Sequence, residues 1–208
     1  NYLIYLVSLV FSYEHWYGRL INLVFSSLGI WAFHQFLRRS LNPQIAFSAG
    51  LLLLSSVWFA FSRKIMPDTF SAALMLMALW AGARFLTVGK IAPLLGFFLA
   101  AAVGGLSKIP VIVLLGLIAI PLFRRGLADS RSKLLIAATG LSFLPVAAWY
   151  FWWQPHLLEA YGNQLYFPFT LKAGVAELLA YWPQTLEKFY FTALQSFLAL
   201  PALTAGIF

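Results

Sequence analysis

Three charged residues lie close together between two long apolar segments of the chain. Arg63, Lys64 and Asp68 fall within residues 62–68, whereas residues 44–61 and 69–83 are almost entirely apolar. Both apolar segments predict membrane-crossing helices, which need roughly 20 residues each. Charges held this close to hydrocarbon are costly, so these side chains must reach the lipid headgroups, pair with one another or line a polar cavity. We call residues 62–68 the charged turn and treat it as the candidate site.

An interfacial anchor is the alternative interpretation of the charged turn. In that case the two cations contact lipid phosphates, and Asp68 begins the next helix, where its carboxylate accepts hydrogen bonds from the free N–H groups of the first turn. The residue types alone leave both interpretations open.

The composition sets the class of protein that must position these charges. The 208 residues are 62% hydrophobic and 10% charged, with a mean hydropathy of +0.85. These values exclude an ordinary soluble domain and predict a polytopic, all-α transmembrane bundle with about seven spans. We expect residues 1–208 to form a single transmembrane domain that is a fragment of a longer chain, because both ends are abrupt.

Several kinds of site are not predicted. Cysteine is absent, and the three histidines share no metal-ligand spacing, so no metal site is expected. The net charge of +8 comes from basic residues scattered in ones and twos at the ends of apolar segments, where they favour anionic headgroups. This pattern does not indicate a nucleic-acid partner.

The two ends of the chain depart from a simple alternation of spans and turns. Residues 1–17 are rich in Tyr and Trp, which favours an interfacial helix leading into the first span after Gly18. Residues 154–192 are aromatic and contain prolines, which predicts a large outer loop with one or two interfacial helices. A last span is expected to begin near Leu194.

Alternation of the spans divides the basic residues between two membrane faces. One face receives Arg38, Arg39, Arg84, Lys90, Arg124, Arg125, Arg131 and Lys133, and the other receives Arg19, Arg63, Lys64, Lys108, Lys172 and Lys188. The positive-inside rule makes the first face cytoplasmic, because its cations cluster in short loops. The charged turn and Lys108 are therefore predicted to emerge together on the non-cytoplasmic face.

Three segments of the sequence carry a family resemblance. They begin at Gly18, Ser62 and Gly96, and contain Arg19-Leu20, Ser62-Arg63 followed by Asp68, and Gly105-Leu106-Ser107-Lys108. In this order they resemble the dolichyl-phosphate-mannose protein mannosyltransferase family, and within it the bacterial branch that includes the lipid A aminoarabinose transferases. The resemblance covers residues 18–125.

The resemblance implies an inverting, C-type membrane glycosyltransferase in a bacterial plasma membrane. Such an enzyme takes a sugar from a polyprenyl-phosphate donor on the outer, periplasmic face and passes it to an acceptor, which the sequence does not name. Cations stabilise the phosphate as it leaves, a role implied for Arg63, Lys64 and Lys108. A carboxylate must deprotonate the acceptor hydroxyl, and in the family this aspartate lies upstream of the position corresponding to Asn1.

Supporting roles follow from the same resemblance. Arg19 would support the site, and Asp68 would orient Arg63 or help to bind a metal ion or a sugar hydroxyl, so whether a divalent cation takes part stays open. Glu14, His156 and Lys172 are candidates for an acceptor groove. For Lys108 the alternative is a helix-end cation facing headgroups, and for the groove candidates it is a solvated surface position.

Two other functional classes remain open at this stage. A secondary transporter also places charges beside broken helices, but it typically shows repeated halves, and no matching pair of segments is present. A noncatalytic membrane subunit would keep the same helices without the chemistry. A carboxylate in the segment upstream of Asn1 would distinguish an enzyme from such a subunit.

Overall fold

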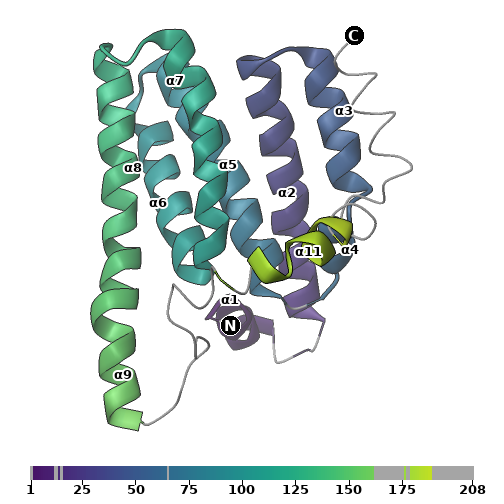
Figure 1. Ribbon diagram of the computed structural model, residues 1–208. Coiled ribbons are helices and arrows are strands. Elements are labelled where there is room, and N and C mark those ends of the chain that lie inside the picture. Colours follow the sequence, from purple (N-terminus) through teal and green to yellow (C-terminus); the bar gives the residue numbers. More distant parts are fainter. Residues whose placement is uncertain are drawn as a thin grey trace.

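The computed structural model describes residues 2–11, 14, 16–64, 66–161, 176 and 179–188, and every element formed by these residues is helical (Figure 1). The prediction of an all-α fold is therefore confirmed for this part of the chain. Lys172 and the span expected near Leu194 lie outside the described residues. The principal helices are α2 (Tyr17–Ser40), α3 (Pro43–Leu54), α5 (Pro67–Val88), α6 (Ile91–Ser107) and α8 (Ser130–Ala148).

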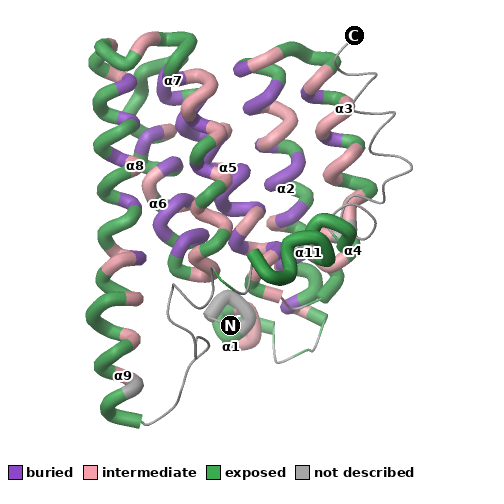
Figure 2. The backbone as a smooth tube through the Cα atoms, in the orientation of Figure 1, coloured by how far each residue is buried: buried purple, intermediate pink, exposed green. Residues whose placement is uncertain are grey.

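Helix α5 is the centre of the bundle. It packs chiefly against α6 and α2, and its buried side chains outnumber those of any other described helix (Figure 2). Small residues allow the close approach, because a Cβ added to Gly29 of α2 would lie only 2.8 Å from the Cα of Ala73 in α5. In a membrane, where lipid is as apolar as the side chains, such close packing is a main source of helix association.

Three helical stretches are long and apolar enough to cross a membrane. They are Tyr17–Ser40, Pro67–Val88 and Ser130–Tyr161, and two shorter apolar helices, α3 and α6, accompany them. The described members of the two predicted groups of cations lie at opposite ends of this bundle. Arg38 and Arg39 end α2 and Arg125 ends α7 (Ala119–Arg125), whereas Arg19 lies in the first turn of α2 and Lys108 follows α6 at the other end (Figure 1).

The prediction of one continuous span over residues 44–61 is wrong. The helix breaks at Ser55 and Ser56, and the short helix α4 (Val57–Phe61) follows. The Ser56 hydroxyl donates to the Leu53 carbonyl at 2.6 Å and accepts from the backbone N–H of Phe59 at 3.3 Å. A serine that bonds to the backbone in this way ends one helix and caps the next.

The C-terminal half contains two less regular helices. Residues Ile109–Ile118 form a 3-10 helix, η1, which leads into α7. After α8, which contains Pro145, a π-helical turn η2 (Trp149–Trp153) continues into α9 (Gln154–Tyr161). Residue 154, where the outer loop was predicted to begin, is therefore not a break in the backbone, because the helix extends to Tyr161.

The N-terminal residues form a separate short helix, α1 (Tyr2–Phe11). It lies across the end of the bundle where α2 begins (Figure 1). This helix falls within residues 1–17, for which an interfacial helix was predicted, and its position in a membrane interface remains a prediction.

Candidate functional site

The charged turn is a compact backbone structure that follows α4. The Ser62 side chain is fully buried, and its hydroxyl donates to the Phe59 carbonyl at 2.6 Å. The backbone N–H of Lys64 donates to the Phe61 carbonyl at 2.9 Å, and that of Met66 donates to the Lys64 carbonyl at 3.0 Å. These bonds reverse the chain before α5 begins at Pro67, a residue suited to the first position of a helix.

A buried amide from α2 fixes this turn. The Asn22 side chain is 6% exposed, and its Nδ2 donates to the carbonyls of Lys64 at 2.6 Å and Met66 at 3.2 Å. The hydroxyl of Thr69 donates to the same Met66 carbonyl at 3.1 Å. Sequence reasoning missed Asn22, although an amide in an apolar span three residues after Arg19 is a signal that could have found it.

Three cations line one open pocket beside the turn. The described residues that line it are Arg19, Ala60, Arg63 and Lys64, and its volume is about 560 Å³. The Lys64 ammonium lies 4.7 Å from the centre of the Phe61 ring, an arrangement typical of cation–π contacts. Because no acidic residue is among the described residues that line it, the pocket concentrates positive charge and favours an anion. The structure therefore brings Arg19, Arg63 and Lys64 together, and we call this hollow the cation pocket.

Lys108 approaches the charged turn through Asp68 and does not line the cation pocket. Its ammonium forms an ion pair with the Asp68 carboxylate, and both side chains are nearly half exposed. Asp68 lies in the first turn of α5 and Lys108 follows the last turn of α6, so each charge also complements the dipole of its own helix. One turn further in, the Ser71 hydroxyl donates to the Gly104 carbonyl at 2.5 Å. The end of α5 is thus fixed to the end of α6.

The two described candidates for the acceptor groove, Glu14 and His156, are not gathered in one place. Glu14 is exposed in the link before α2, where its carbonyl accepts from the backbone N–H of Tyr17 at 3.3 Å. His156 is exposed on α9, which extends below the bundle and away from α4 (Figure 1), and its ring lies 5.8 Å from that of Trp153. Among the described residues, no three His, Asp or Glu side chains are grouped so as to hold a metal ion.

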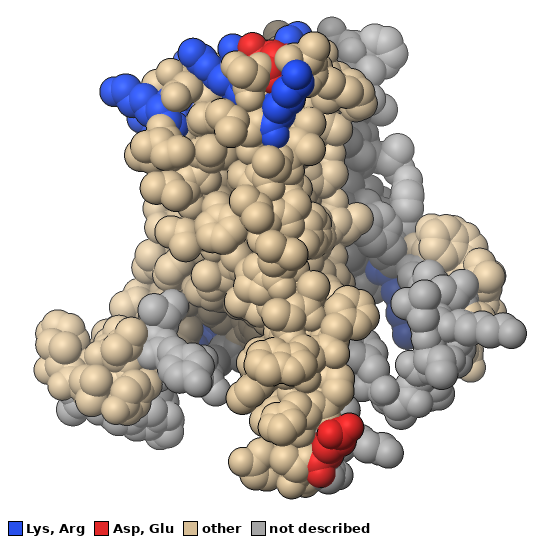
Figure 3. All heavy atoms as spheres, turned by 90° about the vertical axis from the view of Figure 1, so that its left-hand side faces the viewer, with Lys and Arg blue, Asp and Glu red and all other residues tan. Residues whose placement is uncertain are grey.

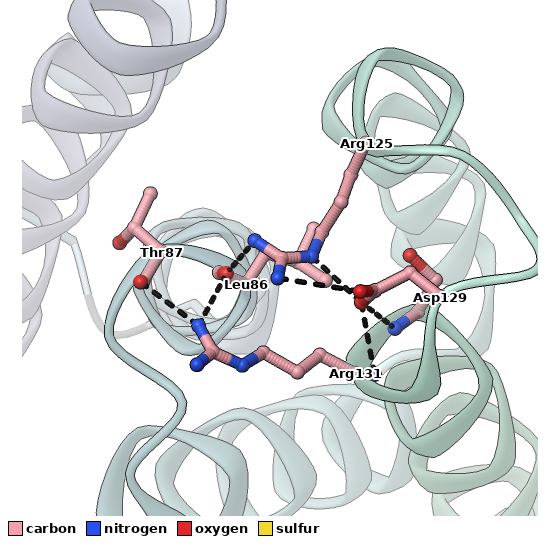
Figure 4. Close-up of polar contacts among 6 residues, drawn as sticks. Leu86, Thr87, Arg125, Asp129 and Arg131 are labelled. Carbon is pink, nitrogen blue, oxygen red and sulfur yellow. Dashed lines mark hydrogen bonds and ion pairs between the residues drawn. The ribbon is translucent and has the colours of Figure 1, made fainter.

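The opposite end of the bundle carries most of the remaining cations. Figure 3 shows Lys and Arg side chains gathered around an acidic group at the end where α8 begins. There Arg125 donates to the Asp129 carboxylate at 2.7 Å, and Arg125 and Arg131 both donate to the Leu86 carbonyl near the end of α5 (Figure 4). The two guanidinium groups satisfy carbonyls that the end of a helix leaves free, so this cluster stabilises the fold.

The pKa of Asp129 is lowered below its ordinary value of 3.8, mainly by the hydrogen bond from Arg125. Partial burial opposes this shift, and the backbone N–H groups of Ser132 and Arg131 add to it. The ionised carboxylate also caps the N-terminus of α8.

Comparison with known families identifies the chain. The family model described as dolichyl-phosphate-mannose-protein mannosyltransferase matches residues 1–153, which include α1 to α8 and the whole cation pocket. The chain belongs to this family. Dolichyl-phosphate-mannose-protein mannosyltransferases are membrane glycosyltransferases that use a lipid-linked sugar donor, and the apolar helices agree with an integral membrane protein. No curated protein and no solved structure matches the chain.

Proposed function

We propose that this mannosyltransferase-family chain moves a sugar from a polyprenyl-phosphate donor to an acceptor on the non-cytoplasmic face of a bacterial plasma membrane. The observation that carries the proposal is the cation pocket, in which Arg19, from α2, meets Arg63 and Lys64, from the charged turn. A lipid-linked donor presents its phosphate at the membrane surface, and the pocket lies at an end of the bundle. The position and the charge of the pocket therefore both suit that phosphate.

The three cations have complementary roles in this proposal. Arg19 and Arg63 offer planar guanidinium groups, which can bind two phosphate oxygens at once, and Lys64 acts as a point charge. When the sugar leaves, the lipid phosphate gains negative charge, and cations already in place stabilise that charge. The acceptor hydroxyl must lose a proton to a carboxylate, and the proposal keeps the expectation that this base lies upstream of Asn1.

Asp68 and Lys108 have a positioning role in the proposal. Because the ammonium of Lys108 is paired with Asp68 and does not line the pocket, we assign it to holding α5 and α6 together beside the charged turn. This assignment replaces the direct phosphate contact that the family resemblance suggested for Lys108. The Asp68 carboxylate is already paired with the Lys108 ammonium, so a role for Asp68 as a metal ligand is less favourable.

The sidedness of the proposal is supported by the distribution of charge. The end opposite the cation pocket carries the clustered basic residues of short loops, which is typical of a cytoplasmic face (Figure 3). The cation pocket would then open on the periplasmic side. An accessible reporter placed at Arg63→Cys should react with a membrane-impermeant thiol reagent from outside the cell, and reaction only after permeabilisation would reverse this assignment.

Sugar transfer in isolated membranes tests the site. Arg63→Ala and Arg19→Ala should each lower kcat/KM for a radiolabelled polyprenyl-phosphate sugar by about 100-fold, as removal of a preorganised charge partner does. Arg124→Ala, an exposed cation at the opposite end, is the control and should keep full activity. Full activity of both pocket variants would refute the phosphate site. Absence of transfer by the intact wild-type protein would favour the noncatalytic subunit.

A further inference from the structure

An aromatic pair with a cation beside it lies where α2 contacts α5, in the half of the bundle away from the cation pocket. The indole rings of Trp31 in α2 and Trp80 in α5 meet edge to face, with ring centroids 5.1 Å apart. The guanidinium carbon of Arg84, also in α5, lies 5.3 Å from the centre of the Trp80 ring. This is a cation–π contact, and it holds Arg84 beside the two rings.

A second arginine, Arg38 of α2, lies on the same side of this contact. The two helices run in parallel, because their contacts advance in the same direction along both: Asn22 with Met66, Phe25 with Phe70, and Trp31 with Trp80. Arg38 is seven residues after Trp31. Arg84 is four residues after Trp80, and both spacings return to nearly the same side of a helix with 3.6 residues per turn.

The two arginines also lie at a similar depth. At 1.5 Å per residue, Arg38 is about 10 Å and Arg84 about 6 Å beyond the level of the ring pair, towards the end of the bundle where α8 begins. We call Trp31, Arg38, Trp80 and Arg84 the α2–α5 arginine site. Its cations lie near the helix ends and its rings lie deeper, which is the order of charge and aromatic surface found where a membrane meets water.

The cations of the α2–α5 arginine site have no anionic partner in the described part of the chain. Both arginines are exposed, and no hydrogen bond or ion pair joins either guanidinium group to a described residue. Asp129, the acidic residue at this end of the bundle (Figure 3), is already bonded to Arg125. A guanidinium group close to hydrocarbon needs acceptors for its N–H donors. Lipid headgroups or water must supply them.

We propose that Arg38 and Arg84 bind the phosphate of an anionic phospholipid in the leaflet at this end of the bundle. A guanidinium group can bind two phosphate oxygens at once, and two such groups on neighbouring helices can share one phosphate. Their combined positive charge favours a headgroup that carries no cation of its own. Trp31 is 50% exposed, so its ring can contact the part of the lipid below the phosphate.

Lipid binding to the purified full chain tests the site. Native mass spectrometry of the protein in detergent, titrated with phosphatidylglycerol or with phosphatidylcholine, measures both affinities. Phosphatidylglycerol should bind more tightly. Arg38→Gln and Arg84→Gln should each weaken its binding about fivefold, the factor expected for one cation beside anionic lipid, and should leave phosphatidylcholine binding unchanged. Equal affinity of the wild type for the two lipids would overturn the proposal.

Lys133→Gln is the matched control, because it removes one exposed cation from the same end of the bundle. Lys133 belongs to α8, which packs against α6 and α5 and lies on the side of the bundle away from α2 (Figure 1). This variant should keep the wild-type affinity for phosphatidylglycerol. A loss as large as that of Arg84→Gln would show a diffuse attraction of charge and would overturn the local site. Arg84→Lys keeps the charge without the planar fork, so it should recover part of the affinity.

Competition with a soluble phosphate separates a lipid site from a general phosphate site. Glycerol 3-phosphate should not displace phosphatidylglycerol at the same concentration, because it has no acyl chains to lie beside the rings, and displacement would overturn the proposal. The Tm of Arg38→Gln in lipid-free detergent should equal that of the wild type. If Arg84→Gln lowers this Tm through loss of the contact with Trp80, Arg38→Gln decides the question. Sugar transfer is not measured here, so the proposed function stands or fails independently.

Discussion

The side-chain amide of Asn22 donates to the carbonyl of Lys64, 42 residues further along the chain, at 2.6 Å. Asn22 lies one helical turn after Arg19, and Lys64 follows Arg63, so this single bond fixes the distance between the cations contributed by α2 and those contributed by the charged turn. The amide is buried, and the bond is consequently protected from competition with water. Asn22 is a positioning residue for the cation pocket.

Replacing Asn22 by leucine should loosen the charged turn. The carbonyls of Lys64 and Met66 would both lose the bond from this amide, and unsatisfied buried groups cost about 1–3 kcal/mol. We expect a lower Tm in detergent and a higher KM for the donor with a smaller change in kcat. The control is Thr139→Val, which removes a hydroxyl that bonds only within α8. An unchanged donor KM in Asn22→Leu would show that the turn keeps its shape without the amide.

The Asp68–Lys108 ion pair predicts coupled effects on stability. Both side chains are more than a third exposed, so the interaction measured with Asp68→Asn, Lys108→Met and the double variant should be only about 0.2–1 kcal/mol. Removing Lys108 alone should weaken donor binding slightly, and Asp68→Asn should restore part of the loss by removing an unpaired carboxylate. If Lys108 contacts the donor phosphate directly, Lys108→Met will raise the donor KM by the same factor in the wild-type chain and in the Asp68→Asn chain.

The sequence was a good guide to the features that depend on composition. High hydropathy predicted the helical class, and basic residues at alternate turns predicted which cations share an end of the bundle. The proximity of Lys108 to Asp68 also follows from this pattern of spans and turns. Because α5 and α6 are consecutive antiparallel helices, the start of α5 lies beside the end of α6. The sequence did not predict which polar side chains of α2 face the bundle interior. Asn22, Ser26 and Ser27 all interrupt the same apolar segment, and the structure buries Asn22 and Ser26 but exposes Ser27.

The break after α3 shows the same limit. Ser26-Ser27 and Ser55-Ser56 are identical dipeptides within apolar segments, yet only the second pair ends a helix. Ser27 donates to the carbonyl four residues earlier and stays within α2, whereas Ser56 donates three residues back and caps α4. The choice depends on packing, because α2 lies against the central helix α5 along its length. Local sequence does not contain that information.

The stability contributed by Asp129 should depend on pH. Its pKa is lower in the folded chain than the unfolded value of 3.8, chiefly because of the bond from Arg125, so the ionised form favours folding. That contribution is complete above the unfolded pKa and is lost as pH falls through the lower folded pKa. The Tm difference between wild type and Asp129→Asn should therefore be constant from neutral pH down to about pH 4 and then shrink.

A matched carboxylate controls for general acid effects. Glu159 is exposed on α9, and Glu159→Gln should leave Tm unchanged over the same pH range. Both variants should retain sugar transfer at neutral pH, because Asp129 lies at the end opposite the cation pocket and Glu159 lies outside its lining. A Tm difference for Asp129→Asn that persists undiminished in acid would show that the side chain acts by packing and not by charge.

The contact of Gly29 with Ala73 provides a test of how packing supports the site. A Cβ at residue 29 would lie 2.8 Å from the Cα of Ala73, which belongs to a helix backbone and cannot move aside without moving α5. Gly29→Ala should therefore destabilise the protein by about 1–3 kcal/mol, as overpacking does. Gly140→Ala, with nothing within 4 Å, should be neutral or stabilising by up to about 1 kcal/mol, since alanine is the better helix former.

Gly29→Ala should also affect the cation pocket, although residue 29 lies ten positions along α2 from Arg19. Displacing α2 from α5 would pull Asn22 and Arg19 away from the charged turn, which is joined directly to α5. The expected result is a raised donor KM that accompanies the loss in Tm. Ala73→Gly in the same chain should relieve both effects only in part, because it removes the Ala73 Cβ at 3.0 Å but leaves the backbone Cα at 2.8 Å. A loss in Tm without any change in donor KM would mean that the hydrogen bonds from Asn22 keep the shape of the cation pocket independently of the packing of α2 against α5.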